Sequence, residues 1–433
     1  MEKSFESKSI IGVRNKFGIT IIGALLFGIG WHIRGSGTSD PTVAMLLLLL
    51  FLSIVFGPRK KFNPYIFGVI VILFRVLRRG WGTLVGQAGI PWVYPGVYDR
   101  FGIIVPWWYG YFWLFVCGIA WSTLAALFLG GYMFSRKNQY TLYDFWLSLV
   151  IFIASWVLGI LIARAIIPHI SPLTYQVYIN GLDGTARNYK AMRDNFAVAF
   201  AIIPVLIYLG FAGKECKFVG DSLMIMIFFG IGFSIADVWQ AIGRNNLDWG
   251  LPFWSLWEYF TGFVIGILVM IFYYRKTRNQ PQSADIDFPY YPKNTMGGKI
   301  LTYLIAHLGL FLFGIQESLR GGLNGALEAL GIGFELETWM GILIILLLDI
   351  PLYTLYQKGL IFRKFKQRSF PEKSIIWLIS LLPFYMTCYL ARIIISGTLF
   401  PLNICALVTY IDIVSFIIVE TYLIINYIQH QNH

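Results

Sequence analysis

Long apolar runs alternate with short polar segments along nearly the whole chain. Each run is long enough to cross a bilayer as a helix, which takes roughly 20 residues. The pattern predicts an all-α protein, a polytopic bundle of about twelve transmembrane helices, with boundaries good to a few residues. The predicted spans are 17–33, 41–57, 64–79, 106–131, 141–167, 194–212, 219–238, 253–274, 299–318, 338–357, 374–396 and 402–428.

Basic clusters recur after every second predicted span. They begin at the N-terminus with Lys3 and Lys8 and return at Arg59-Lys60-Lys61, Arg136-Lys137 and Arg363-Lys364. Cytoplasmic loops of membrane proteins carry an excess of Lys and Arg, so this spacing places both termini in the cytoplasm. We therefore expect a multi-pass protein of the cell (plasma) membrane.

The longest polar stretch, 275–298, divides the predicted spans into two groups. We expect a membrane bundle of about eight spans at 1–274, a cytoplasmic linker at 275–298 and a bundle of about four spans at 299–433. A weak internal repeat relates Phe27-Gly28-Ile29, followed by Arg34-Gly35, to Phe313-Gly314-Ile315, followed by Arg320-Gly321. Duplication and simple small-residue packing faces explain this similarity equally well.

Composition agrees with the hydropathy pattern and narrows the function classes. The chain is 57% hydrophobic and only 13% charged, with a mean hydropathy of +0.67. Its net charge of +12 lies mostly in short loops, as membrane topology requires, and does not indicate nucleic-acid binding. The four Cys have no CxxC spacing, and no nucleotide-binding, hydrolase or zinc motif is present. The sequence therefore predicts no metal site and identifies no cofactor.

The two kinds of basic residue are distributed unequally across the predicted membrane. Of the twelve Lys and Arg residues that this topology leaves off the cytoplasmic side, eleven are Arg. The planar guanidinium fork binds phosphate or carboxylate in two parallel hydrogen bonds and tolerates partial burial. This bias indicates an anion-binding site on the outer face.

Five outer segments carry most of the polar side chains, and we expect them to converge on one cavity. Arg34 and Arg320 each precede Gly, which would leave backbone N–H groups accessible beside the guanidinium. Their alternative role is anchoring to lipid head groups. The predicted substrate-binding residues are Arg34, Arg79, Gln240, Arg244, Gln316, Glu317 and Arg320.

Three ionisable residues are candidates for general acid–base catalysis. His32 lies at the outer end of the first span and can exchange a proton near neutral pH, although a structural hydrogen-bonded His is the simpler interpretation. Asp237 shares a helix face with Gln240, three residues on. Glu258 lies inside an apolar span, where it must either pair with a cation or act as an acid or base. His307, Asp349 and Asp412 lie deeper in the predicted spans; they are too scattered to define an ion path but keep transport as an alternative.

Three functions remain open. The first is a membrane-embedded transferase acting on a lipid-linked phosphate or pyrophosphate, or on a phospholipid, with Arg residues stabilising leaving-group charge. The second is a transporter or flippase for an organic or lipid-linked anion, although carriers usually place their sites near the midplane. The third is a non-catalytic membrane assembly component. The expected partners are membrane lipids and an anionic, possibly lipid-linked substrate.

Overall fold

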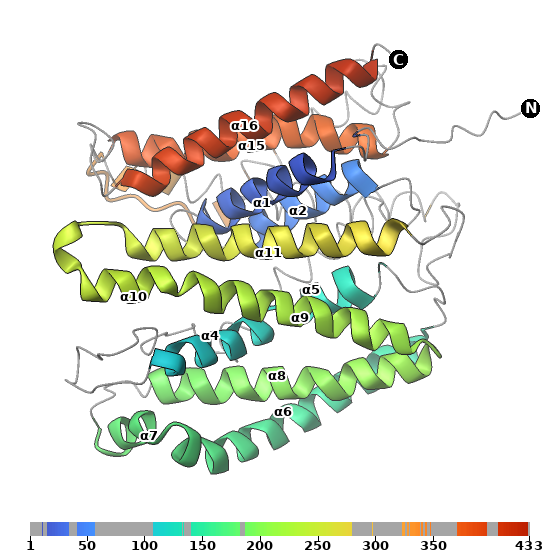
Figure 1. Cartoon of the computed structure of the whole chain (residues 1–433), viewed down its shortest axis with the longest axis vertical. Coiled ribbons are helices and arrows are strands. Elements are labelled where there is room, and N and C mark those ends of the chain that lie inside the picture. Colours follow the sequence, from blue (N-terminus) through green and yellow to red (C-terminus); the bar gives the residue numbers. More distant parts are fainter. Residues whose placement is uncertain are drawn as a thin grey trace, which may run out of the picture. The chain divides into compact units, whose positions relative to one another are not determined.

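In the computed structural model of the 433-residue chain, every regular element among the described residues is a helix (Figure 1). The described residues are 11, 15–33, 41–56, 107–131, 133, 140–181, 187–278, 297, 323–324, 327–328, 330–337, 339–340, 343, 347, 370–395 and 406–431. Within these ranges, six helices are long and apolar enough to cross a membrane, or seven if one bent pair is a single span. By the length and hydropathy of its helices, the chain is a multi-pass membrane protein.

Helices occupy most of the predicted spans, because an apolar segment in lipid must satisfy its backbone hydrogen bonds internally. The predicted spans 64–79 and 299–318 lie outside the described residues, as does nearly all of 338–357. The predicted total of about twelve spans, the orientation and the internal repeat therefore stay predictions. So does the division at 275–298, most of which is likewise outside the described part of the chain.

The helices group into two compact units. The first unit contains α1 (Lys16–Ile33), α2 (Pro41–Phe56), α11 (Phe253–Arg278), α15 (Phe370–Ile395) and α16 (Leu407–Gln431). The second contains α4 (Trp107–Trp121), α5 (Thr123–Ala125), η2 (Ala126–Gly131), α6 (Leu142–Ile170), α7 (Pro172–Ile179), α8 (Arg187–Ala212), α9 (Cys216–Ala236), α10 (Val238–Asn245) and η4 (Leu247–Trp249).

In the first unit, α1 packs against α2, α11 and α16, and α15 packs against α2 and α16. Small residues bring α1 and α11 very close together. A Cβ added at Gly262 would lie 2.5 Å from the carbonyl oxygen of Phe27, and one at Gly266 would lie 2.8 Å from the Cα of Ala24. The GxxxG spacing of Gly262 and Gly266 thus serves the close backbone approach expected of that motif in membranes.

In the second unit, α6 packs along α8, while α4 packs on α8 and α9. The predicted single span 106–131 is bent by 52° between Gly110–Trp121 and Thr123–Gly131, with Ser122 at the break. Close approach to α9 accompanies the bend. A Cβ at Gly118 would lie 2.5 Å from the carbonyl oxygen of Phe229, and one at Gly130 would lie 2.4 Å from that of Asp221.

The segment between α6 and α8 falls between the predicted spans 141–167 and 194–212, yet most of its described residues are helical. Helix α6 instead continues to Ile170, α7 follows with Pro172 at its first turn, and α8 begins at Arg187. Proline favours the first helical turn, where its missing N–H has no partner to lose. These helical turns lie beyond the ends of the apolar spans, so a hydropathy pattern does not detect them.

At the other end of α6, a capping box fixes the start of the helix. The Thr141 side chain accepts a hydrogen bond from the Asp144 backbone N–H, and the Asp144 carboxylate accepts one from the Thr141 N–H. The Tyr208 hydroxyl of α8 donates to the same carboxylate at 2.6 Å. Burial raises the pKa of Tyr140 just before this helix, and the charges of Glu215 and Asp144 add to the effect. Its protonated hydroxyl donates to the Leu209 carbonyl.

Candidate functional site

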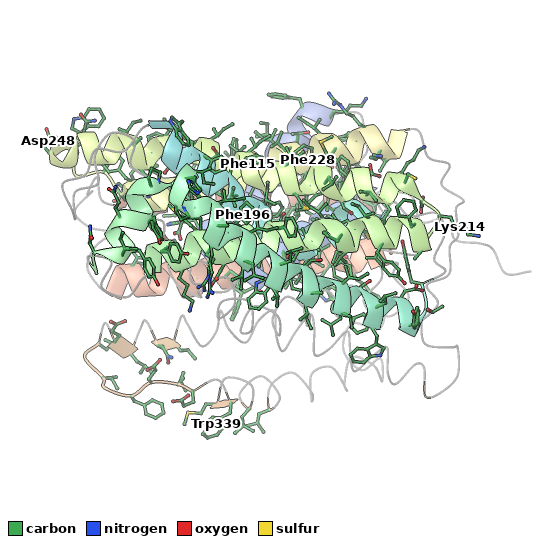
Figure 2. All side chains as sticks on the ribbon, turned by 90° about the horizontal axis from the view of Figure 1, so that it is seen from below. Phe115, Phe196, Lys214, Phe228, Asp248 and Trp339 are labelled. Atoms are coloured by element: carbon green, nitrogen blue, oxygen red, sulfur yellow. The ribbon has the colours of Figure 1, made fainter. Side chains whose placement is uncertain are left out.

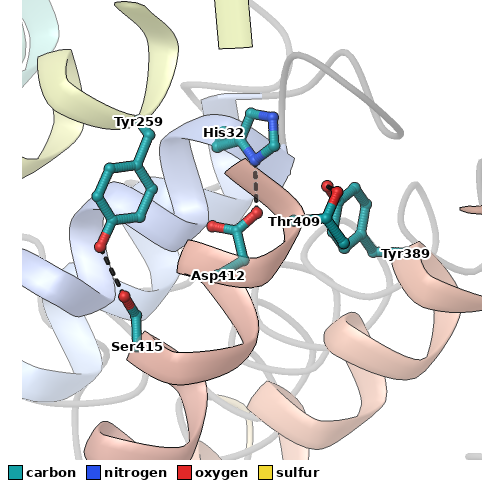
Figure 3. A network of polar contacts seen from close by, with 6 residues as sticks. All are labelled: His32, Tyr259, Tyr389, Thr409, Asp412 and Ser415. Carbon is teal, nitrogen blue, oxygen red and sulfur yellow. Dashed lines mark hydrogen bonds and ion pairs between the residues drawn. The ribbon is translucent and has the colours of Figure 1, made fainter. Parts of the chain in front are cut away.

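A buried polar network connects α1, α11, α15 and α16 in the first unit (Figure 3). Its centre is a contact of 2.5 Å between Nδ1 of His32 and Oδ2 of Asp412, whose side chains are 2% and 0% exposed. An ionised carboxylate can only accept hydrogen bonds, so with Asp412 ionised Nδ1 of His32 is the donor. With this donor, the contact fixes the orientation of the imidazole and places a ring proton on Nδ1.

Aromatic and hydroxyl side chains surround this pair. The ring of Tyr389 meets the His32 ring edge-on, with centroids 5.7 Å apart and planes at 79°. The Tyr389 hydroxyl contacts Thr409 Oγ1 at 2.9 Å and lies near the Asp412 carboxyl group. Figure 3 shows Thr409, Asp412 and Ser415 on neighbouring turns of α16.

On the α11 side, the Tyr259 hydroxyl contacts Ser415 Oγ at 2.7 Å. The Tyr259 ring packs against α1 at Gly28, where an added Cβ would lie only 3.2 Å from the ring. Among the described residues, no hydrogen-bond partner is found for Oδ1 of Asp412.

The network lies toward one end of the first unit. His32 is the penultimate residue of α1, while Asp412 is five residues and Ser415 eight residues from the start of α16. At 1.5 Å per residue, these α16 positions are roughly 8 and 12 Å from the helix end. Half of a bilayer's hydrocarbon core is about 15 Å thick. If the helix end marks the membrane surface, Asp412 is about halfway to the midplane and Ser415 is closer to the midplane than to the surface.

Two other predicted residues are buried in the second unit. Asp237, which separates α9 from α10, is fully buried, and neither of its carboxylate oxygens has a hydrogen-bond partner among the residues that the structure describes. Gln240 is buried one turn further on, at 5% exposure. The nearby Ser234 hydroxyl donates to the Tyr111 carbonyl of α4, which ties this end of α9 to its neighbour.

The remaining predicted residues are described only in part. Glu258 is buried at 4% exposure on α11, beside Tyr259 of the network. Arg244 lies on α10, with its side chain outside the described part of the structure. The expected convergence of the outer segments therefore stays a prediction. The predicted binding residues outside the described ranges are Arg34, Arg79, Gln316, Glu317 and Arg320.

Sequence reasoning identified His32 but neither its partner nor the hydroxyl groups around it. Asp412 was noted only as a deeper residue without a partner, and Thr409, Ser415 and Tyr389 were not singled out. A signal was available in α16, where Thr409, Asp412 and Ser415 are spaced three apart in an otherwise apolar stretch. That spacing places all three on one helix face.

Among the described residues, no group of three or more His, Cys, Asp or Glu side chains is arranged to hold a metal ion. Compared with models of known protein families, with curated proteins and with solved structures, the chain matches none of them.

Proposed function

We propose that the protein is a membrane-embedded transferase in which His32 accepts a proton from the substrate. The observation that carries the proposal is the buried His32–Asp412 pair. A carboxylate that holds one imidazole nitrogen while the other faces a substrate is the arrangement by which proteins make histidine a general base. Burial also removes competing water, which strengthens the interaction with developing charge.

The proposed substrate is a lipid-linked phosphate or pyrophosphate, or a phospholipid. In this reaction the acceptor hydroxyl forms a bond to the transferred group and gives its proton to His32. The bond from that group to the donor phosphate breaks, and the phosphate leaves with the electron pair. The Arg residues predicted from the sequence, Arg34 and Arg320 first among them, would stabilise the leaving phosphate.

The first test compares the lipids that co-purify with wild-type protein and with two variants. Arg34→Ala/Arg320→Ala should lose an anionic lipid that wild-type protein retains. His32→Asn should keep that lipid, because an Asn amide nitrogen can replace Nδ1 as donor to Asp412 but offers no proton-accepting nitrogen. Mass spectrometry of the extracted lipids identifies the retained species.

The identified lipid then becomes the substrate of a turnover assay with candidate acceptors. Loss of a general base typically costs 10²–10⁴-fold in rate, so His32→Asn should be slower by about that factor. His430→Asn is the matched control, because His430 lies at the opposite end of α16 near Glu372, at 3.4 Å, and is 28% exposed. Equal rates for the His32 variant and the wild type would reject His32 as the base.

A second candidate function is transport of an organic or lipid-linked anion, and Asp237 favours it. A fully buried carboxyl group without a hydrogen-bond partner, at a helix interruption, is typical of proton- or cation-coupled carriers. In this case Asp237→Asn should abolish uptake into liposomes, while no covalent turnover of the lipid is seen.

A further inference from the structure

Helix α6 presents one long apolar face that no described helix covers. Only 6% of the residues in the apolar stretch of this helix are buried. The exposed fraction is between 48% and 59% for each of Val150, Ile153, Val157 and Leu161. These four residues are three or four positions apart, so they form one stripe along the helix. In a membrane-spanning helix such a stripe faces acyl chains.

Arg164 continues this stripe, three residues after Leu161. It is exposed, and within the described residues it forms no hydrogen bond or ion pair. Arg164 is six residues, or roughly 9 Å, from the end of α6 at Ile170. A charged side chain on a lipid-facing stripe is costly unless it reaches the head-group region and finds an anion there.

Two further cations lie on the first turns of α8, the helix that packs along α6. Lys190 is exposed, and Arg193 is held in place by two contacts to Oδ1 of the buried Asp194, from Nε at 2.8 Å and Nη2 at 2.7 Å. Since α6 packs along α8 and the two helices are joined at this end, Arg164 lies at the same end as Lys190, Arg193 and Asp194, and all three cations act electrostatically on the Asp194 carboxyl group. Three cations against one carboxylate leave the cluster net positive.

Aromatic rings flank the cluster at the same end of the second unit. The rings of Tyr178 on α7 and Tyr189 on α8 are stacked, with centroids 4.2 Å apart. Tyrosine is enriched at the membrane–water interface, where its ring meets lipid and its hydroxyl meets water. Positive charge, the apolar stripe of α6 and a pair of stacked aromatic rings therefore occur together at this end of the unit.

We propose that Arg164, Lys190 and Arg193 bind the head-group phosphate of an anionic phospholipid whose acyl chain lies along the Val150–Leu161 stripe of α6. The net positive charge selects an anionic lipid over a zwitterionic one. Asp194 is a positioning residue, which keeps the Arg193 guanidinium fixed. This site belongs to α6 and α8 and does not depend on the function proposed for His32.

The test measures lipid binding to the full chain by native mass spectrometry. The probes are dioleoyl phosphatidylglycerol and dioleoyl phosphatidylcholine, which differ in head group and net charge but share their acyl chains. The site variant is Arg164→Gln/Lys190→Gln, which leaves the Arg193–Asp194 contact intact. The control is Lys214→Gln/Lys217→Gln, two exposed Lys at the opposite end of the unit, where Figure 2 labels Lys214.

Wild-type protein should retain phosphatidylglycerol in preference to phosphatidylcholine. In the site variant this preference should fall about tenfold. In the control variant it should fall less than about twofold, because Lys214 and Lys217 do not belong to the cluster of Arg164, Lys190 and Arg193. Both variants should have the wild-type unfolding temperature in phosphatidylcholine, which separates binding from folding. Equal preference losses in the two variants, no preference in wild-type protein, or another protein bound along α6 in place of lipid would each overturn the proposal.

Discussion

Removing the carboxylate of Asp412 while His32 stays in place tests the centre of the buried network. The two side chains are 0% and 2% exposed, so solvent cannot take over the lost contact. In Asp412→Ala the imidazole keeps a buried Nδ1–H that has lost its acceptor. Leaving a buried donor without its acceptor costs about 1–3 kcal/mol. Because each 1.4 kcal/mol is a factor of ten, the ratio of folded to unfolded protein should fall about 5- to 150-fold.

Removing both partners should be far less harmful to stability. Replacing a buried pair by apolar side chains is often neutral, or stabilises by about 1–4 kcal/mol. His32→Phe/Asp412→Leu should therefore recover most of the stability lost in Asp412→Ala. It should not recover lipid turnover, since the proton-accepting nitrogen is absent. Equilibrium unfolding in mixed micelles, followed by circular dichroism, gives the stabilities, and the turnover assay gives the activity.

The partly exposed pair of His430 and Glu372 is the control for this cycle. Their side chains are 28% and 23% exposed, so Glu372→Ala should change the free energy of unfolding by less than about 1 kcal/mol. A cost for Asp412→Ala as small as that for Glu372→Ala would show that the His32–Asp412 pair does not stabilise the fold. A double variant that regains turnover along with stability would show that the pair is structural and that His32 has no part in the reaction.

Substitutions at three further places, two of them paired with a control, test the helix contacts and caps of the two units by the same unfolding measurement. Gly262→Ala should destabilise the protein by about 1–3 kcal/mol, because the added Cβ would lie 2.5 Å from a carbonyl oxygen. Gly220→Ala is its control: a Cβ there meets nothing within 4 Å, so the protein should become more stable by about 0.5–1 kcal/mol. The opposite ranking would refute the close helix contact. Thr141→Ala removes the N-cap of α6 and should cost about 1 kcal/mol; Thr141→Ser, which keeps the cap, should cost less. Tyr259→Phe should cost about 0.5–1.5 kcal/mol and slow turnover less than His32→Asn does.

Hydropathy is enough to locate the helices because a lipid-exposed backbone has no alternative to internal hydrogen bonding. It does not predict the bend at Ser122, since that bend accompanies α9 approaching Gly118 and Gly130, and helix contacts of this kind leave no trace in a local apolar run. It also does not predict α7 or the first turns of α8. These helices carry polar residues beyond the apolar core, and only Pro172 marks a start.

The candidate site shows the same division between local and distant information. His32 was identifiable because an ionisable residue at the end of an apolar helix is unusual. Its partner Asp412 is 380 residues away, so only the tertiary structure joins them. The hydroxyl groups of Tyr259 and Tyr389 were also hidden, because aromatic residues are common throughout membrane interfaces and cores.

Two buried carboxyl groups, one in each unit, distinguish the two candidate functions. Asp412 is bonded to a histidine near the end of its helix, which is the arrangement of a fixed catalytic base. Asp237 is buried without a hydrogen bond, which is the arrangement expected of a group that gains and loses a proton or cation during transport. A transferase should therefore tolerate Asp237→Asn and lose turnover in His32→Asn, with substrate still bound. A carrier should lose movement of its substrate in Asp237→Asn, because the neutral amide can no longer exchange a proton or compensate a cation.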